Sequence, residues 1–103
     1  MLESAYKTCL AFETAHRGLA VQREVAMPLK FRGVQLDCGY RLDILVERVV
    51  IVEVKAIARL ERVHAAQLLS YLRLMRLKVG LLINLNVPLL RSGIQRVVNG
   101  FPD

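Results

Sequence analysis

The sequence predicts a mixed α/β domain in which helices flank one sheet. Two segments repeat apolar residues at three- and four-residue spacing, as helices do, and several others have the composition and length of strands. The second helical segment stands between two strand-like segments, so it makes a crossover connection. The expected order is therefore helix, three antiparallel strands, helix and strand, in a mixed sheet.

The first helix is expected over residues 2–17, because apolar side chains recur there at helical spacing and Gly18 supplies a C-terminal stop. These apolar positions are Leu2, Tyr6, Cys9 and Leu10. A strand follows over residues 19–31, and Pro28 restricts it to a sheet edge or a bulge. Arg32 and Gly33 then supply a turn.

Two more strands are expected over residues 34–46 and 49–57, at hairpin spacing. The second helix is expected over residues 60–75. Its apolar side consists of Leu60, Val63, Leu68, Leu72 and Met75.

The C-terminal part contains a short apolar run over residues 79–85, which predicts a central strand buried on both faces. Residues 86–93 have loop composition. Residues 94–98 fit a final edge strand or a short helix, and the pattern leaves both open.

The composition fits one folded domain. With 103 residues, of which 54% are hydrophobic, the chain has enough apolar surface for a core, so disordered and disulfide-stapled classes are poor matches. Cys9 and Cys38 have no metal-site spacing and are expected as buried free thiols. A mean hydropathy of +0.37 suggests a self-associating surface, and we expect a homodimer.

Charge and length limit the partners. The net charge of +6 suggests that the binding partner is a polyanion. The absence of Trp argues against a protein that binds single-stranded nucleic acid by stacking its bases on aromatic side chains. No apolar run approaches the roughly 20 residues that span a bilayer. The N-terminus also lacks the order of a signal peptide, so we expect a cytoplasmic protein without membrane contact.

The register of the central hairpin decides where its acidic residues lie. Glu53 and Lys55 share one face of their strand, because side chains alternate. A two-residue turn would pair Asp43 with Val52 and place Glu53 on the other face. A three-residue loop over residues 47–49 pairs Asp43 directly with Glu53.

The apolar pattern favours the three-residue loop, because one face then becomes wholly apolar. That face consists of Leu42, Ile44, Val46, Val50, Val52 and Val54. Asp43, Glu53 and Lys55 gather on the other face. Two opposed carboxylates repel each other unless a cation or proton lies between them, and hard divalent cations prefer carboxylate oxygens. The hairpin therefore predicts a metal site.

Other polar residues have competing interpretations. Gln67 and Tyr71 stack on one face of the second helix and could reach the same site, or they could be ordinary residues of a half-exposed helix. His64 is interpreted as a packing or capping residue. Arg41 points to the same side as Asp43 and could meet phosphate. Taken alone, Glu53 and Lys55 would be a surface ion pair.

These residues carry a family resemblance. Asp43, the Glu53-x-Lys55 triplet and Gln67-x-x-x-Tyr71, set on this order of elements, resemble the PD-(D/E)XK phosphodiesterase superfamily and its RecB-like nucleases with a QxxxY motif. More closely, the chain is similar to the small prokaryotic GxxExxR family over essentially its whole length. The similar segments are LESAYKTCLAFE, LDCGYRLDILVE, VIVEVKAI, VHAAQLLSYLRL and VGLLINLNVPLLRSGIQRVVN.

The resemblance implies a restriction-endonuclease-like fold over residues 1–103, shorter at its N-terminus than the family. It implies Mg²⁺ (or Mn²⁺) bound by Asp43, Glu53 and the carbonyl of Val54, with Glu3 of the first helix completing the site. Glu3 also fits a first-turn carboxylate that complements the helix dipole. The resemblance assigns catalytic roles to Asp43, Glu53, Lys55, Gln67 and Tyr71.

The function expected from this resemblance is metal-dependent hydrolysis of phosphodiester bonds in nucleic acid, with DNA as the expected substrate. Lys55 would orient the attacking water or stabilise developing charge. The alternative is a catalytically silent module of the same fold that binds nucleic acid or a protein partner as a homo-oligomer. The residues leave open whether one or two metals bind.

Overall fold

The computed structural model describes residues 3–100 apart from the side chain of Cys38, and it confirms the predicted order of elements. The elements are α1 (Glu3–His16), β1 (Val21–Phe31), β2 (Val34–Val46), β3 (Val50–Lys55), α2 (Arg62–Met75), β4 (Val79–Asn84), the 3-10 helix η1 (Leu90–Gly93) and β5 (Ile94–Val98). Leu2, the expected start of the first helix, lies outside the described residues. The last segment is a strand, and the expected loop before it contains η1.

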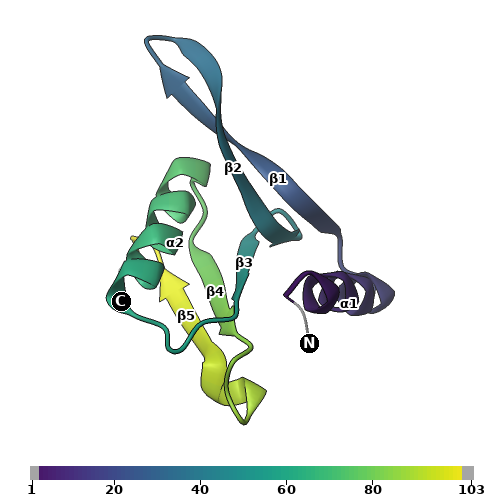
Figure 1. Ribbon diagram of the computed structural model, residues 1–103. Coiled ribbons are helices and arrows are strands. Elements are labelled where there is room, and N and C mark those ends of the chain that lie inside the picture. Colours follow the sequence, from purple (N-terminus) through teal and green to yellow (C-terminus); the bar gives the residue numbers. More distant parts are fainter. Residues whose placement is uncertain (1–2, 101–103) are drawn as a thin grey trace.

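One five-stranded sheet joins these elements in the order β1-β2-β3-β4-β5. The pairs β1–β2, β2–β3 and β4–β5 are antiparallel, whereas β3 and β4 are parallel. The parallel pair requires the crossover through α2, as the sequence predicted. In Figure 1, α1 and α2 lie on opposite sides of the central strands.

Each face of the sheet carries its own hydrophobic cluster. On the α2 side, Leu68 and Leu72 pack with Ile51 of β3. On the α1 side, Ala11 packs with Val52 and other apolar residues of the sheet. The neighbours Leu82 and Ile83 are buried in different clusters, which confirms that β4 is covered on both faces.

Two expectations about burial are wrong. Cys9 is exposed on α1, whose buried side consists of Tyr6, Leu10 and Ala11. Val63 is 66% exposed, because the stripe of α2 that packs against the sheet runs through Ala65, Leu68 and Leu72, and Val63 lies on another side of the helix. The side chain of Cys38 lies outside the described part of the chain.

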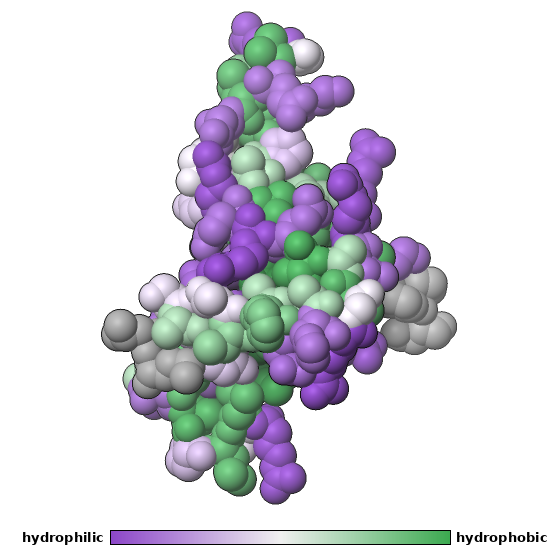
Figure 2. Space-filling view, turned by 90° about the vertical axis from the view of Figure 1, so that its right-hand side faces the viewer, coloured by the Kyte–Doolittle hydropathy of each residue, from purple (hydrophilic) through white to green (hydrophobic). Residues whose placement is uncertain are grey.

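The outer part of the β1–β2 hairpin, residues 28–37, projects from the body, and we call it the arm (Figure 1). Arg32 and Gly33 at its tip have φ of +52° and +77° and form the predicted turn between Phe31 and Val34. The register shifts between Ala26 and Pro28, so the proline lies at an irregularity of an edge strand, as predicted. Figure 2 shows hydrophilic side chains projecting from this region, with apolar ones between them.

No helix within residues 3–100 has the length and apolar content needed to span a bilayer.

Candidate active site

The β2–β3 hairpin has the register of the three-residue loop. Val46 pairs with Val50 and Ile44 pairs with Val52, so the next position out sets Asp43 opposite Glu53. Regular pairing stops there, and side chains supply the next hydrogen bonds. The backbone N–H of Asp43 donates to Glu53 Oε2 at 2.8 Å, and that of Val54 donates to Asp43 Oδ2 at 2.8 Å. The two carboxylates therefore meet in the gap where β2 and β3 separate.

A backbone irregularity in β1 accompanies this gap. Glu24, which the register places opposite Asp43, has φ of +50°, a left-handed conformation that is unusual for a glutamate. The side-chain alternation of β2 changes at the same point. Leu42 packs on the α2 side with Leu45, so the prediction that it shares a face with Ile44 is wrong. The irregular pairing at Glu24 and Asp43 is the physical reason, because strict alternation holds only along a regular strand.

Lys7 belongs to α1, on the side of the sheet opposite α2, and reaches this gap from there. Its Nζ donates to Asp43 Oδ1 at 3.1 Å and lies 3.9 Å from Glu24 Oε1. Burial alone would lower the pKa of Lys7, but the hydrogen bond and charge of Asp43, aided by Glu24 and Glu3, raise that pKa above its ordinary value. The ammonium group thus compensates Asp43, a role that sequence reasoning missed. The available signal was Lys7 one turn after Glu3 on a helix flanking the sheet.

Glu53 is the most deeply buried acid of the site, with 7% of its surface exposed. Burial raises the pKa of its carboxyl to about 7, against the opposing effect of the hydrogen bond from Asp43. The charge of Asp43 raises the pKa further, while the cations Lys55 and Lys7 lower it. A buried carboxylate of this kind is stabilised by a nearby cation, because the cation favours its ionised form.

The gap offers the oxygen donors that a hard divalent cation requires. The N–H and C=O of one strand residue point to the same edge, so the Val54 carbonyl faces β2 together with its N–H. Asp43, Glu53 and this carbonyl leave the remaining positions of a six-coordinate ion to water. Within residues 3–100, no three His, Cys, Asp or Glu side chains lie close enough together to hold a metal ion, so Glu3 does not form such a cluster with the pair.

Lys55 ends β3 beside these carboxylates. Alternation places it on the same side of β3 as Glu53, and its charge acts on the Glu53 carboxyl. Its backbone is held between neighbours, because Leu85 donates to the Lys55 carbonyl at 2.8 Å. The strand therefore presents the half-buried ammonium next to the carboxylate pair.

The other predicted residues lie on elements around the site. Gln67 and Tyr71 are half-buried on α2, and the Tyr71 ring lies 6.0 Å from that of Tyr40 in β2. His64 accepts a hydrogen bond from the Glu61 N–H at 2.8 Å and is a capping residue, as predicted. Arg41 donates two hydrogen bonds of 3.0 Å to Asp37 and so forms an ion pair within β2, while its contact with phosphate stays a prediction.

Asn84 is a second residue that the sequence analysis did not single out. It is 1% exposed at the end of β4 and pairs in register with Lys55. Its amide oxygen accepts from the N–H groups of Ile57 and Asn86, and its amide nitrogen donates to the Ile57 carbonyl at 3.0 Å. These bonds hold the chain just after Lys55. A polar residue in an apolar strand was the available signal.

Replacing Asn84 with alanine is expected to lower the free energy of unfolding by about 2 to 3 kcal/mol, because backbone groups of Ile57 lose buried partners. Urea denaturation followed by circular dichroism measures the change. Asn86→Ala is the matched control, since Asn86 is exposed and donates to the same carbonyl at 3.2 Å. It is expected to cost under about 1 kcal/mol. Equal losses in the two variants would contradict the assigned role of Asn84.

Comparison with known proteins agrees with this geometry. The family model described as the PD-(D/E)XK nuclease superfamily matches residues 1–97. Searches of curated proteins and of solved structures gave no match. Nucleases of this superfamily generally use divalent metal ions, in accord with the oxygen donors at the β2–β3 gap. With a match over nearly the whole chain and the mixed sheet flanked by helices, this protein belongs to the PD-(D/E)XK nuclease superfamily.

Proposed function

We propose that this chain is a metal-dependent nuclease that hydrolyses phosphodiester bonds, with DNA as its substrate. The observation that carries the proposal is the convergence of Asp43 and Glu53 in one gap of the sheet, joined through two backbone hydrogen bonds, with Lys55 beside them. Two carboxylates and a lysine in this arrangement suit hydrolysis of a charged diester.

Asp43, Glu53 and the Val54 carbonyl would hold Mg²⁺ or Mn²⁺. When bound, the ion supplies Lewis-acid polarisation of a phosphate oxygen and lowers the pKa of a water molecule. Glu3, in the first turn of α1, would be an additional ligand only after moving toward the pair, because in this structure it forms no three-residue cluster with Asp43 and Glu53. The oxygen donors and the burial of Glu53 support this assignment.

Lys55 acts on the reacting phosphate in this proposal. Its ammonium holds the attacking water by a hydrogen bond and stabilises negative charge as it develops on the phosphate oxygens. Gln67 and Tyr71 position the substrate strand or Lys55 from α2. Their support is their place on the helix that covers this side of the sheet.

The resemblance to the GxxExxR family and to the QxxxY nucleases supports the same chemistry. We also propose a cytoplasmic location and a homodimer, from the sequence composition and hydropathy.

Lys7 favours a second candidate function. Its ammonium donates a hydrogen bond to Asp43 Oδ1, where it takes the place of a metal ion beside that oxygen. A chain that keeps this contact would bind nucleic acid or a protein partner through the same fold without cleaving a diester.

The test combines ion binding with cleavage. Calorimetric titration with Mg²⁺ and Mn²⁺ is expected to show binding to the wild type and strongly reduced binding to Glu53→Gln. Glu13→Gln is the control, since Glu13 pairs with Arg17 at the surface. Plasmid cleavage should require the ion and stop with EDTA. Ion binding that Glu53→Gln leaves unchanged would overturn the site. Salt-sensitive DNA binding without cleavage in either metal would establish the second candidate.

A further inference from the structure

A groove separates the arm from the C-terminal end of α2. Its volume is about 500 Å³. Pro28, Lys30 and Gln35 line it from the arm, and Arg73, Leu74 and Arg76 line it from the helix end. All six are exposed, so the groove is open to solvent.

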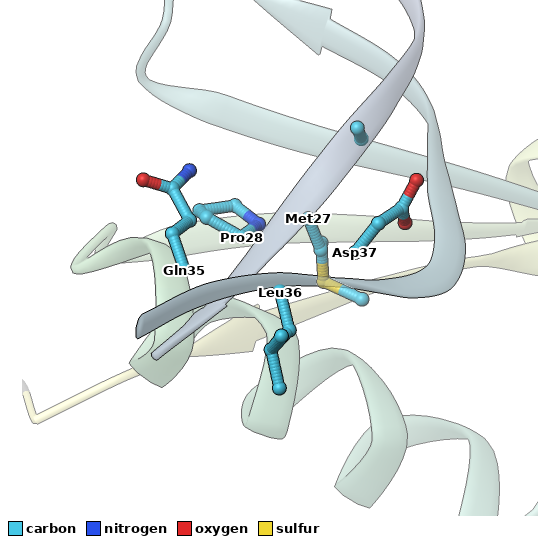
Figure 3. Close-up of a pocket in the computed structure, with 6 residues that line it drawn as sticks. Met27, Pro28, Gln35, Leu36 and Asp37 are labelled. Carbon is cyan, nitrogen blue, oxygen red and sulfur yellow. The ribbon is translucent and has the colours of Figure 1, made fainter. Parts of the chain in front are cut away.

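The groove is uniformly basic. Three of its lining residues are cations and none is an acid. In the part of the chain that the structure describes, Lys30, Arg73 and Arg76 form no ion pair. The nearest acid along β2 is Asp37, which is paired with Arg41. Figure 3 shows Gln35 and Asp37 rising from the same side of β2, with Leu36 between them pointing the other way. Asp37 therefore lies near the groove, but its carboxylate is paired with Arg41 and not with any of the three groove cations.

The groove and the candidate active site share the same two elements. Asp43 and Gln35 both belong to β2, and Tyr71 and Arg73 both belong to α2. Between the two regions, Tyr40 and Tyr71 bring strand and helix together with ring centroids 6.0 Å apart. Asp43 lies eight residue steps along β2 from Gln35, which sets an upper limit of about 26 Å on the separation of their Cα atoms.

We infer that this groove binds the phosphate backbone of a DNA duplex at a distance from the bond that is cleaved. The inference rests on the proposed function and adds a subsite to it. Phosphates of one duplex strand recur about every 3.4 Å along the axis. The groove would therefore contact a phosphate within roughly eight base pairs of the reacting one.

The side chains suit a sugar-phosphate backbone better than a base edge. Arginine donates two parallel hydrogen bonds to phosphate oxygens, lysine adds a point charge, and the Gln35 amide can donate as well. Pro28 and Leu74 offer apolar contact to sugar rings. The simpler interpretation is that basic residues at the end of α2 only stabilise the helix dipole. That interpretation does not involve Lys30, which belongs to the arm.

The test is the salt dependence of DNA binding, measured in EDTA so that no cleavage occurs. A labelled 24-base-pair duplex is titrated with wild type and with the triple variant Lys30→Gln/Arg73→Gln/Arg76→Gln, using fluorescence anisotropy. The triple variant is expected to bind about 10- to 100-fold more weakly, and the slope of log K against log salt should fall by about two to three. If the triple variant does not fold, Lys30→Gln alone should lower the slope by about 0.9.

The matched control removes the same charge elsewhere. Arg48→Gln/Arg91→Gln/Arg96→Gln also changes the net charge by three, at exposed positions that do not line the groove. Equal loss of affinity in both triple variants, or an unchanged slope in the groove variant, would overturn the inference. Displacement of the duplex by polyglutamate as readily as by unlabelled DNA would also overturn it, in favour of an acidic protein partner.

A separate measurement keeps this inference apart from the proposed function. Hydrolysis of a small diester with a single phosphate, in Mn²⁺, should be unchanged in the groove variant, because that substrate cannot span both regions. Loss of this activity would contradict a remote subsite. Absence of hydrolysis in the wild type would refute the proposed chemistry while the binding result still decides the groove.

Discussion

Asp43→Asn is expected to reduce metal-dependent cleavage of DNA by at least about 100-fold, because the site loses one of its two carboxylates and the ion is held less tightly. The asparagine oxygen can still accept the hydrogen bond from the Val54 N–H, whereas the hydrogen bond from Lys7 is lost because the amide NH2 cannot accept it. Initial cleavage rates at saturating Mg²⁺, together with the thermal unfolding midpoint, separate lost chemistry from lost folding.

Asp37→Asn is the matched control for this prediction. Asp37 lies on the same strand, and its carboxylate pairs with Arg41 rather than with the site. Its substitution should leave the cleavage rate within about twofold, since surface ion pairs contribute little to stability. Wild-type cleavage by Asp43→Asn under the same conditions would show that the reaction occurs elsewhere in the molecule.

The stability of the metal-free protein is expected to fall as pH rises from 4.5 to about 7, because of Glu53. Burial raises the pKa of this carboxyl to about 7 in the folded chain, whereas in the unfolded chain it is 4.5. Below pH 4.5 the carboxyl of Glu53 is neutral in both the folded and the unfolded state, so its ionisation does not change the free energy of unfolding. Above pH 7 the folded chain carries a buried charge. The difference is worth up to about 3 kcal/mol.

Urea denaturation in EDTA at pH 5 and pH 8 measures this effect. Glu53→Gln keeps an oxygen that can accept the Asp43 N–H but does not ionise, so its stability relative to wild type should increase between the two pH values. Added Mg²⁺ should stabilise the wild type at pH 8 more than at pH 5, since the ion binds the carboxylate form.

The surface residue Glu13 provides the control for this pH dependence. Glu13→Gln removes an acid that pairs with Arg17 in solvent, so its stability difference from wild type should not follow the same pH window. A Glu53→Gln variant whose stability relative to wild type is the same at pH 5 and pH 8 would contradict the burial of an ionisable Glu53.

The β2–β3 hairpin shows what the residue pattern within one segment can predict and what it cannot. Alternation of charged and apolar residues along residues 34–57 selected the three-residue loop, and the pairing of Val46 with Val50 agrees. The same reasoning placed Leu42 on the wrong face, because it assumed a regular strand. The departure coincides with a left-handed Glu24 in the neighbouring strand, a conformation that no local residue pattern indicates.

The order of helices and strands, the hairpin loop and the pairing of Asp43 with Glu53 were readable from the chain, because these features follow from short-range periodicity and strand geometry. Three other features could not be predicted from the chain. They are the approach of Lys7 to Asp43, the hydrogen bonds of Asn84 and the groove between Lys30 and Arg76. Each depends on how elements distant in sequence are oriented when they pack, and that orientation results from the summed contacts of the whole core rather than from any one segment.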